Sequence, residues 1–187
     1  MGPEHYCALL RKFGRSNLLR MDGFCDIGCG CGNPNPTYSS MYPTKLSVAV
    51  DVDPLKIHVL KARMHAHGAF IHPIQLDFVR EWDSDELHQL HHKTVLYLLN
   101  NINFSSMNNA FLHFFRRHAA EDSAVICYST LFPEYSNEQS TRSEWSPYIE
   151  MVDHYSVEVS PNDHYWRATG TIQQFYVYRR TSTIFVV

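Results

Sequence analysis

The sequence has no long apolar run, and its first residues lack the pattern of a secretory signal. No stretch approaches the roughly 18 consecutive apolar residues that a membrane-spanning helix needs. The first residues, MGPEHYCALLRK, lack the basic-then-apolar order of a secretory signal. We therefore expect no membrane partner and an intracellular location, nuclear or cytoplasmic.

Cysteine is sparse and odd in number, with five residues in the chain. Three of them lie close together, at Cys25, Cys29 and Cys31. Such near neighbours do not readily bridge one another, so we expect free thiols, as in a reducing compartment. Their spacing also lacks the paired Cys-x-x-Cys of structural zinc sites.

No charge of one sign dominates the chain. The 16 basic and 19 acidic residues leave a net charge of −3, so no overall positive field recruits nucleic acid. Local basic pairs such as Arg116–Arg117 keep nucleic acid open as a partner, although a solvated surface explains them equally well. The 187 residues are 44% hydrophobic, without a repeat or linker, which predicts one globular domain over residues 1–187. Nothing in the sequence indicates an oligomeric state.

Glycine is scarce, and its placement is informative. The chain has eight glycines, yet the stretch CDIGCGCGNPNP (25–36) has three of them at every second position behind Asp26. Glycines in such a turn let backbone approach a ligand that a side chain would exclude. Their spacing differs from the Gly-x-Gly-x-x-Gly of dinucleotide-binding turns. Two prolines follow at once and predict only a short helix there, over about Asn35–Met41.

Apolar runs and helical periodicity alternate along the chain. We expect strands at Gly23–Gly28, Lys45–Asp51, Ala69–Leu76, Thr94–Leu99, Ser123–Tyr128, Ile149–Val159 and Ile172–Arg180. We expect further helices at Tyr6–Leu19, Leu55–His67, Ser84–His92 and Met107–His118, and a polar loop over Ser129–Pro147. This alternation predicts an α/β fold. It is a Rossmann-like, seven-stranded, mostly parallel sheet with an antiparallel C-terminal edge and helices on both faces.

Ligands bind such folds beyond the carboxyl ends of the strands. The glycine turn follows the first expected strand, Asp51 ends the second, and Asp77-Phe78 follows the third. This order resembles motif one and its partner positions in the Rossmann-type S-adenosylmethionine-dependent methyltransferases. Ordinary turn glycines and helix-capping acids would explain each feature alone, but not as readily their shared order.

The resemblance implies S-adenosyl-L-methionine as the cofactor. It places Asp51 at the ribose hydroxyls and Asp77 at the adenine amino group, with Phe78 covering the adenine ring. It also implies cofactor-binding positions at Asp26, Gly28, Gly30 and Gly32. We expect Asp26 to order the amides of the glycine loop and water rather than to act as a general base.

The second half of the chain resembles a narrower family. The segments are TVLYLLNNINF (94–104), VEVSP (157–161), Thr169-Gly170 and Phe175-Tyr176. Their order over residues 26–181 is similar to that of the SET-less histone lysine methyltransferases of the disruptor-of-telomeric-silencing family. The resemblance implies a basic protein substrate such as a histone or nucleosome.

That resemblance also implies roles for single residues. Asn100 would lie beside the transferring methyl group, and Phe104 and Tyr176 would line the lysine channel. Glu4 would meet the amino group of the cofactor. The chain departs from the family at Ile102, where an aromatic residue is usual, and in the family's N-terminal extension, which is nearly absent.

Methyl transfer from a sulfonium needs alignment of the reacting atoms more than an acid and a base. The absence of a recognisable catalytic dyad therefore agrees with this chemistry. Two alternatives remain: a methyltransferase of the same fold that acts on RNA or a small molecule, and a non-catalytic cofactor-binding module. The acidic balance and the lack of an Asn-Pro-Pro-Tyr segment after the fourth strand oppose RNA.

Histidine is abundant, with twelve residues. Three of them, His88, His91 and His92, fall on one face of an expected helix. No carboxylate is placed obviously beside them to complete a metal site. We therefore expect a solvated helix surface and no bound metal.

Overall fold

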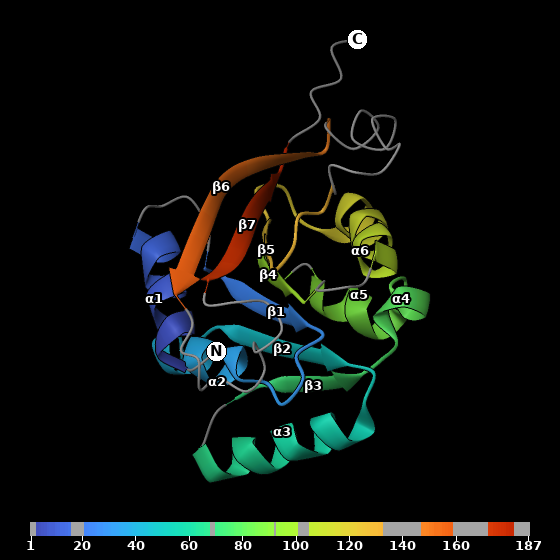
Figure 1. Cartoon of the computed structure of the whole chain (residues 1–187). Helices are drawn as coiled ribbons and strands as arrows, with labels where there is room; N and C mark the ends of the chain where they lie inside the picture. The colour runs from blue at the N-terminus through green and yellow to red at the C-terminus, as the bar shows by residue number, and fades with distance from the viewer. Residues whose placement is uncertain are drawn as a thin grey trace.

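The computed structural model describes residues 3–15, 21–67, 70–91, 93–100, 105–132, 147–158 and 172–181. A single sheet of seven strands runs through it in the order β3-β2-β1-β4-β5-β7-β6 (Figure 1). The strands are β1 (Gly23–Ile27), β2 (Leu46–Asp51), β3 (His72–Gln75), β4 (Leu96–Leu99), β5 (Ala124–Cys127), β6 (Ile149–Glu158) and β7 (Ile172–Arg180). The first five are mutually parallel. Strand β7 is antiparallel to both of its neighbours, β5 and β6.

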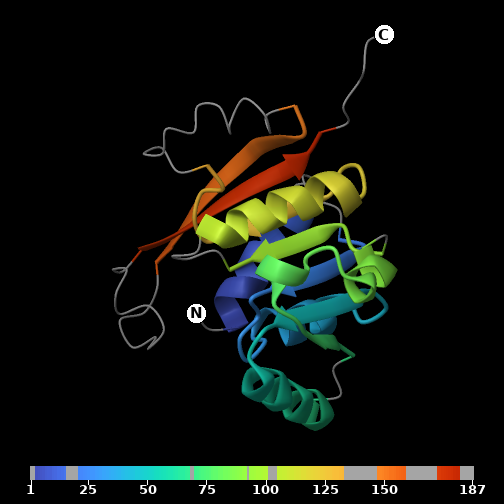
Figure 2. The same ribbon diagram turned by 90° about the vertical axis from the view of Figure 1, so that its right-hand side faces the viewer.

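Helices lie on both faces of this sheet (Figures 1 and 2). They are α1 (Pro3–Arg15), α2 (Pro34–Met41), α3 (Pro54–His67), α4 (Phe78–Glu81), α5 (Asp85–His91) and α6 (Ser105–His118). Helices α1, α2 and α3 cover one face, and α4, α5 and α6 cover the other. The α/β fold predicted from the sequence is confirmed, including the antiparallel pair at one edge. Among the described helices, none is long and apolar enough to cross a membrane.

The central strands are apolar throughout because both of their faces are covered. Every residue of β4 (LYLL) and β5 (AVIC) is buried, as expected for strands between two helical layers. On the α6 side the ring of Tyr97 meets three phenylalanines of α6 edge-on, at centroid distances of 5.6–5.9 Å. On the opposite side Phe24 stacks on Tyr38 of α2 at 4.9 Å. Each fully buried ring of this kind contributes about 1.5–3 kcal/mol of hydrophobic free energy.

The observed elements differ from the expected ones mainly at their ends. Strand β3 begins at His72 rather than Ala69, and α2 begins at Pro34, where a proline costs no hydrogen bond. The sequence pattern missed α4, because four residues are too few to show a helical period. Its start is nevertheless encoded locally: Asp77 Oδ1 accepts a hydrogen bond from the N–H of Val79 at 3.2 Å. The Glu81 side chain accepts one from the N–H of Asp77 at 3.0 Å.

Candidate functional site

The glycine turn follows β1 at the carboxyl edge of the sheet. Gly28, Gly30 and Gly32 have φ angles of 74°, 57° and 69°, in the left-handed region that side chains disfavour. The N–H groups of Gly28 and Cys29 both donate to the carbonyl oxygen of Val50, at 2.8 and 3.0 Å. The turn is therefore tied to the end of β2 and its backbone conformation explains why glycine recurs at every second position.

Two of these glycines serve different purposes. A Cβ atom at Gly32 would lie 2.5 Å from Cδ1 of Leu60, so Gly32 allows α3 to pack against the turn. A Cβ atom at Gly30 would meet nothing within 4 Å. Gly30 therefore faces open space, and a side chain there would occupy room available to a ligand.

That open space is a cavity of about 160 Å³. Its walls come from the glycine turn, the start of α2, α1, α3 and the residues that follow β4 and β5. The lining residues are Tyr6, Asp26, Gly28, Cys29, Gly30, Cys31, Asn33, Pro34, Lys56, Asn100 and Tyr128. The cavity lies at the carboxyl ends of β1 and β4, where the strand order reverses, which is the ligand crevice of open α/β sheets.

Asp51 lies behind the lining of the cavity and organises the turn. Its Oδ2 atom accepts a hydrogen bond from the N–H of Gly30 at 2.7 Å, and its Oδ1 atom accepts one from the N–H of Asp53 at 3.0 Å. The Nζ atom of Lys56 lies 3.9 Å from Oδ1. The carboxylate is 6% exposed and therefore well placed to hold backbone in position.

Asp26 has a different environment from the one expected. Its side chain is 2% exposed, and its Oδ2 atom has no hydrogen-bond partner. The N–H groups of Gly28, Cys29, Gly30 and Gly32 bond instead to Val50, Asp51 and Cys29, so Asp26 orders none of these four amides by a hydrogen bond. Burial raises the pKa of Asp26 well above its ordinary value, and the charge of Asp51 raises it further.

Asn100 follows β4 and lies beside the glycine turn. Its N–H donates to the carbonyl oxygen of Ile27 at 3.0 Å, and its Nδ2 donates to that of Gly28 at 3.3 Å. The structure therefore places this predicted catalytic residue in the wall of the cavity, with its side chain on the turn. Its role in catalysis stays a prediction.

Three further predicted residues, Asp77, Phe78 and Tyr176, do not line this cavity. Asp77 caps α4, and Arg80 Nε lies 3.5 Å from its carboxylate. Phe78 is buried in the core, with its ring 5.6 Å from that of Phe114. Tyr176 is half-buried on β7 and stacks on His154 at 5.6 Å. Phe104 and the side chain of Glu4 lie outside the described residues, so their predicted roles are not addressed.

Two tyrosines of the cavity wall were not anticipated from the sequence. Tyr6 of α1 and Tyr128, just after β5, share a hydrogen bond between their hydroxyls at 2.5 Å, 122 residues apart in the chain. Burial is the main reason why the pKa of Tyr128 is raised, and the neighbouring Tyr6 and Asp26 raise it further. No local pattern reveals such a pair. Lys56 could have been found, because it lies in the first turn of the helix expected at Leu55–His67, close in sequence to Asp51.

Known proteins share the fold but not the sequence. No protein-family model matches the chain, and no curated protein matches its sequence. TrmN from Thermus thermophilus has a TM-score of 0.67 at 15% identity, over 95% of this chain and 48% of that one. The chain thus spans about half the length of that protein. An RNA methyltransferase from Salinibacter ruber, in complex with S-adenosyl-L-homocysteine, has a TM-score of 0.59 at 12% identity, over 93% and 90% of the two chains.

A third similar structure is the precorrin-6y C5,15-methyltransferase of Geobacter metallireducens. Its TM-score is 0.58 at 10% identity, over 96% of this chain and 86% of that one. At such identities the likeness establishes the fold, a Rossmann-like sheet that methyltransferases use. None of these three is described as a histone lysine methyltransferase.

Proposed function

We propose that this protein is an S-adenosylmethionine-dependent methyltransferase that acts on a small molecule or an RNA. The observation that carries the proposal is the left-handed glycine turn, which opens onto a cavity at the carboxyl edge of a methyltransferase-like sheet. The non-catalytic alternative would keep the same turn and cavity, so turnover must decide between them.

The charges around the turn fit this cofactor. Asp26 brings an unpartnered, buried carboxyl oxygen to the cavity, and Asp51 lies close enough to raise its pKa. Two neighbouring carboxylates disfavour a further anion and favour a cationic ligand. S-adenosylmethionine carries a sulfonium and an ammonium group, and when bound it supplies an activated methyl group. Asp26 would accept a hydrogen bond from it, and Gly30 leaves the space that it needs.

The residues of the chain itself position and enclose this site. Asn100 holds the carbonyl of Gly28 and so fixes the turn against the end of β4. The hydroxyls of Tyr6 and Tyr128 satisfy each other, so the two rings close one wall without an unpaired polar group. Alignment of this kind can lower a displacement barrier by several kcal/mol, up to about 10 kcal/mol in the best cases. The site needs no general base to do so.

The charge of the cavity favours a small acceptor over RNA. Lys56 is the one basic residue among the described residues that line it. Arg116, Arg117 and Arg179 lie at the opposite edge of the sheet, near the C-terminal end of α6 and the start of β5. RNA is supported instead by the Salinibacter structure. The lysine acceptor ranks below both, because Tyr176 does not line the cavity.

Calorimetry with S-adenosylmethionine tests the cofactor. The full chain should bind it, and Asp51→Ala should weaken binding by about 1–3 kcal/mol, because the variant loses charged hydrogen bonds that order the turn. Asp53→Ala is the matched control: it removes a carboxylate two residues away that caps α3 instead. A chain that binds no S-adenosylmethionine would contradict the proposal.

Transfer from labelled cofactor tests the acceptor. Metabolite pools, RNA, and histones or nucleosomes should be offered in parallel, and we expect label in the metabolite or RNA arm. Asn100→Ala should abolish turnover while the fold, followed by circular dichroism, is retained. Full activity in that variant would discredit the assigned role of Asn100. Cofactor binding without transfer to any acceptor class would favour the non-catalytic module.

A further inference from the structure

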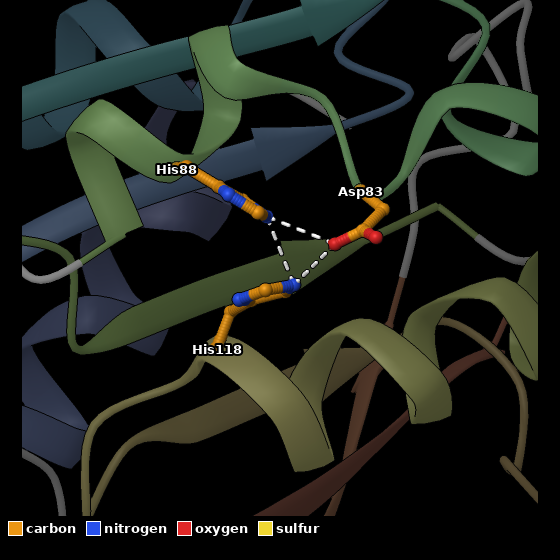
Figure 3. A group of neighbouring side chains, drawn as sticks. All are labelled: Asp83, His88 and His118. Atoms are coloured by element: carbon orange, nitrogen blue, oxygen red, sulfur yellow. Dashed lines mark hydrogen bonds and ion pairs between the residues drawn. The ribbon is translucent and has the colours of Figure 1, made fainter.

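A second polar cluster lies among the helices α4, α5 and α6 on one face of the sheet, away from the cavity. It consists of Asp83, in the turn between α4 and α5, His88 of α5, and His118, the last residue of α6. Figure 3 shows the two imidazole rings and the carboxylate pointing toward a common centre. Helix α6 begins after the carboxyl end of β4 and ends, at His118, just before the amino end of β5. The cluster therefore lies toward the amino ends of the strands, whereas the glycine turn lies at their carboxyl ends.

Three atoms of this cluster lie in mutual contact. Asp83 Oδ1 lies 3.0 Å from Nε2 of His88 and 2.7 Å from Nε2 of His118. The two Nε2 atoms are themselves 2.9 Å apart. The three elements that supply these atoms are separated by up to 35 residues in the chain, so the tertiary fold, not local sequence, creates the contact.

Three hydrogen bonds cannot satisfy this triangle. An ionised carboxylate only accepts, and an imidazole nitrogen carries either a proton or a lone pair. If both Nε2 atoms are protonated, they donate to Asp83 but face each other as two donors. If one is unprotonated, it faces the carboxylate as a second acceptor. Partly exposed aspartate is ionised at neutral pH, so one contact of the three is always mismatched. A cation at the centre removes the mismatch, because all three lone pairs then point at it.

The surroundings hold these groups in place. Arg117 Nη1 donates to the other carboxylate oxygen, Asp83 Oδ2, at 2.8 Å. This bond orients the carboxylate and leaves Oδ1 directed at the histidines, as outer-sphere partners of metal ligands do. The ring of His118 lies 5.7 Å from Phe114 and 6.1 Å from Trp82, and its side chain is 10% exposed.

We propose that Asp83, His88 and His118 bind a divalent transition-metal ion, with Zn²⁺ as the first candidate. Two imidazoles and one carboxylate form a ligand set that zinc uses, with the fourth position taken by water. The Asp83 side chain is 40% exposed, which leaves that position open to solvent. Tetrahedral zinc at about 2.0–2.1 Å from each ligand needs ligand atoms about 3.3 Å apart. The three ligand atoms reach that separation if each pair of them moves apart by about half an ångström.

The proposed ion would join α5 to the end of α6. It binds far from the cavity, so we assign it a structural role and not a part in methyl transfer. The sequence drew attention to His88 together with His91 and His92 and expected no metal there. The structure instead gives His88 different partners, and it supplies the carboxylate that the helical pattern lacked. The proposal does not depend on the proposed function.

Zinc titration of the full chain tests the site. After dialysis against a chelator, the protein should bind one Zn²⁺ by calorimetry. His88→Ala and Asp83→Ala should each weaken binding by at least about tenfold, because each removes a direct ligand. His58→Ala, which removes an exposed histidine from α3, is the matched control and should keep the wild-type affinity. Equal affinity in wild type, His88→Ala and Asp83→Ala, or no binding by wild type, would overturn the proposal.

A second measurement is independent of the folding of any variant. Co²⁺ added to the wild-type chain should give the visible absorption of a low-coordinate site with nitrogen and oxygen ligands, and added Zn²⁺ should remove it. Intense near-ultraviolet thiolate-to-cobalt bands would place the ion on cysteines such as Cys31 instead, and would overturn the assignment. Thermal melting with and without Zn²⁺ should show a rise for wild type and His58→Ala and none for His88→Ala.

Discussion

Single residues of the glycine turn separate stability from ligand binding. Gly30→Ala and Gly32→Ala both place a side chain at positive φ, which costs about 1–2 kcal/mol. Only Gly32→Ala also presses on Leu60, so we expect it to lower the free energy of unfolding by about 1–3 kcal/mol more, as overpacking does. Urea denaturation of the two variants measures this difference.

The same pair should behave in the opposite order toward the cofactor. Gly30→Ala fills open space at the cavity, so it should lose more S-adenosylmethionine affinity than Gly32→Ala. Each variant thus serves as the control of the other. Equal stability together with equal affinity would show that the two glycines are interchangeable and that Gly30 does not face the ligand.

Asp26 predicts a pH dependence of stability in the ligand-free chain. Burial raises its pKa above the ordinary value of 3.8, so between that value and the raised one the folded state binds a proton that the unfolded state has released. The free energy of unfolding therefore falls as pH rises through this range. Asp26→Asn lacks the titration. Chemical denaturation from about pH 4 to about pH 8 should show a smaller loss for Asp26→Asn. Parallel curves for the two proteins would contradict the assignment.

At the scale of single residues, the sequence predicted those that are required by the local backbone conformation. The glycine spacing identified the turn, because a left-handed conformation demands glycine where it occurs. The sequence could not reveal the contact between Tyr6 and Tyr128, or that between His88 and His118, because residues so far apart in the chain leave no shared pattern. It also could not show that Asp51, rather than Asp26, accepts the hydrogen bond from Gly30. Asp26 lies inside β1, and the pairing of Ile27 with Val50 places Asp51, the last residue of β2, beside the turn that follows β1.

At the scale of the elements, ligand binding at the glycine turn can be measured by the alkylation rate of a cysteine in the turn. Cys31 lines the cavity, whereas Cys7 of α1 does not, and both are partly exposed. We expect S-adenosylmethionine to slow the alkylation of Cys31 severalfold and to leave Cys7 unchanged. Mass spectrometry of peptides labelled over time measures both rates in one sample. Cys25 should not be alkylated with or without S-adenosylmethionine, because burial raises the pKa of its thiol. Equal protection of Cys7 and Cys31 would show a general tightening rather than a ligand at the turn.

The central strands β4 and β5 were predicted closely for a physical reason. Strands buried on both faces read as unbroken apolar runs, as LYLL in β4 and AVIC in β5 do. Helix α4 was missed because its stability comes from capping by Asp77 and from the burial of Phe78 against α6. The cap is local but involves too few residues to show a period, and the packing of Phe78 on α6 is tertiary.

For the whole molecule, bound ligands should raise the melting temperature. At a cofactor concentration one hundred times Kd, the gain is about 2.7 kcal/mol, which corresponds to about 5–10 °C for a chain of this size. Zinc should add its own increment, since the cavity and the Asp83 cluster lie toward opposite edges of the sheet and share no residue. The two gains in free energy should sum to within about 0.5 kcal/mol. Differential scanning calorimetry with each ligand and with both measures this. A strongly non-additive result would mean that the sites are coupled.

The position of β7 between β5 and β6 has a consequence for synthesis. On a ribosome, β5 and β6 emerge first and cannot yet pair with the strand that separates them. Until residues 172–180 leave the exit tunnel, the outer side of β5 is an open row of amides and carbonyls that invites pairing with another nascent chain. The last of the seven described strands to be made is therefore the one that joins β6 to the rest of the sheet, and a product stalled or cut before residue 172 should be far more prone to aggregate than one that contains β7.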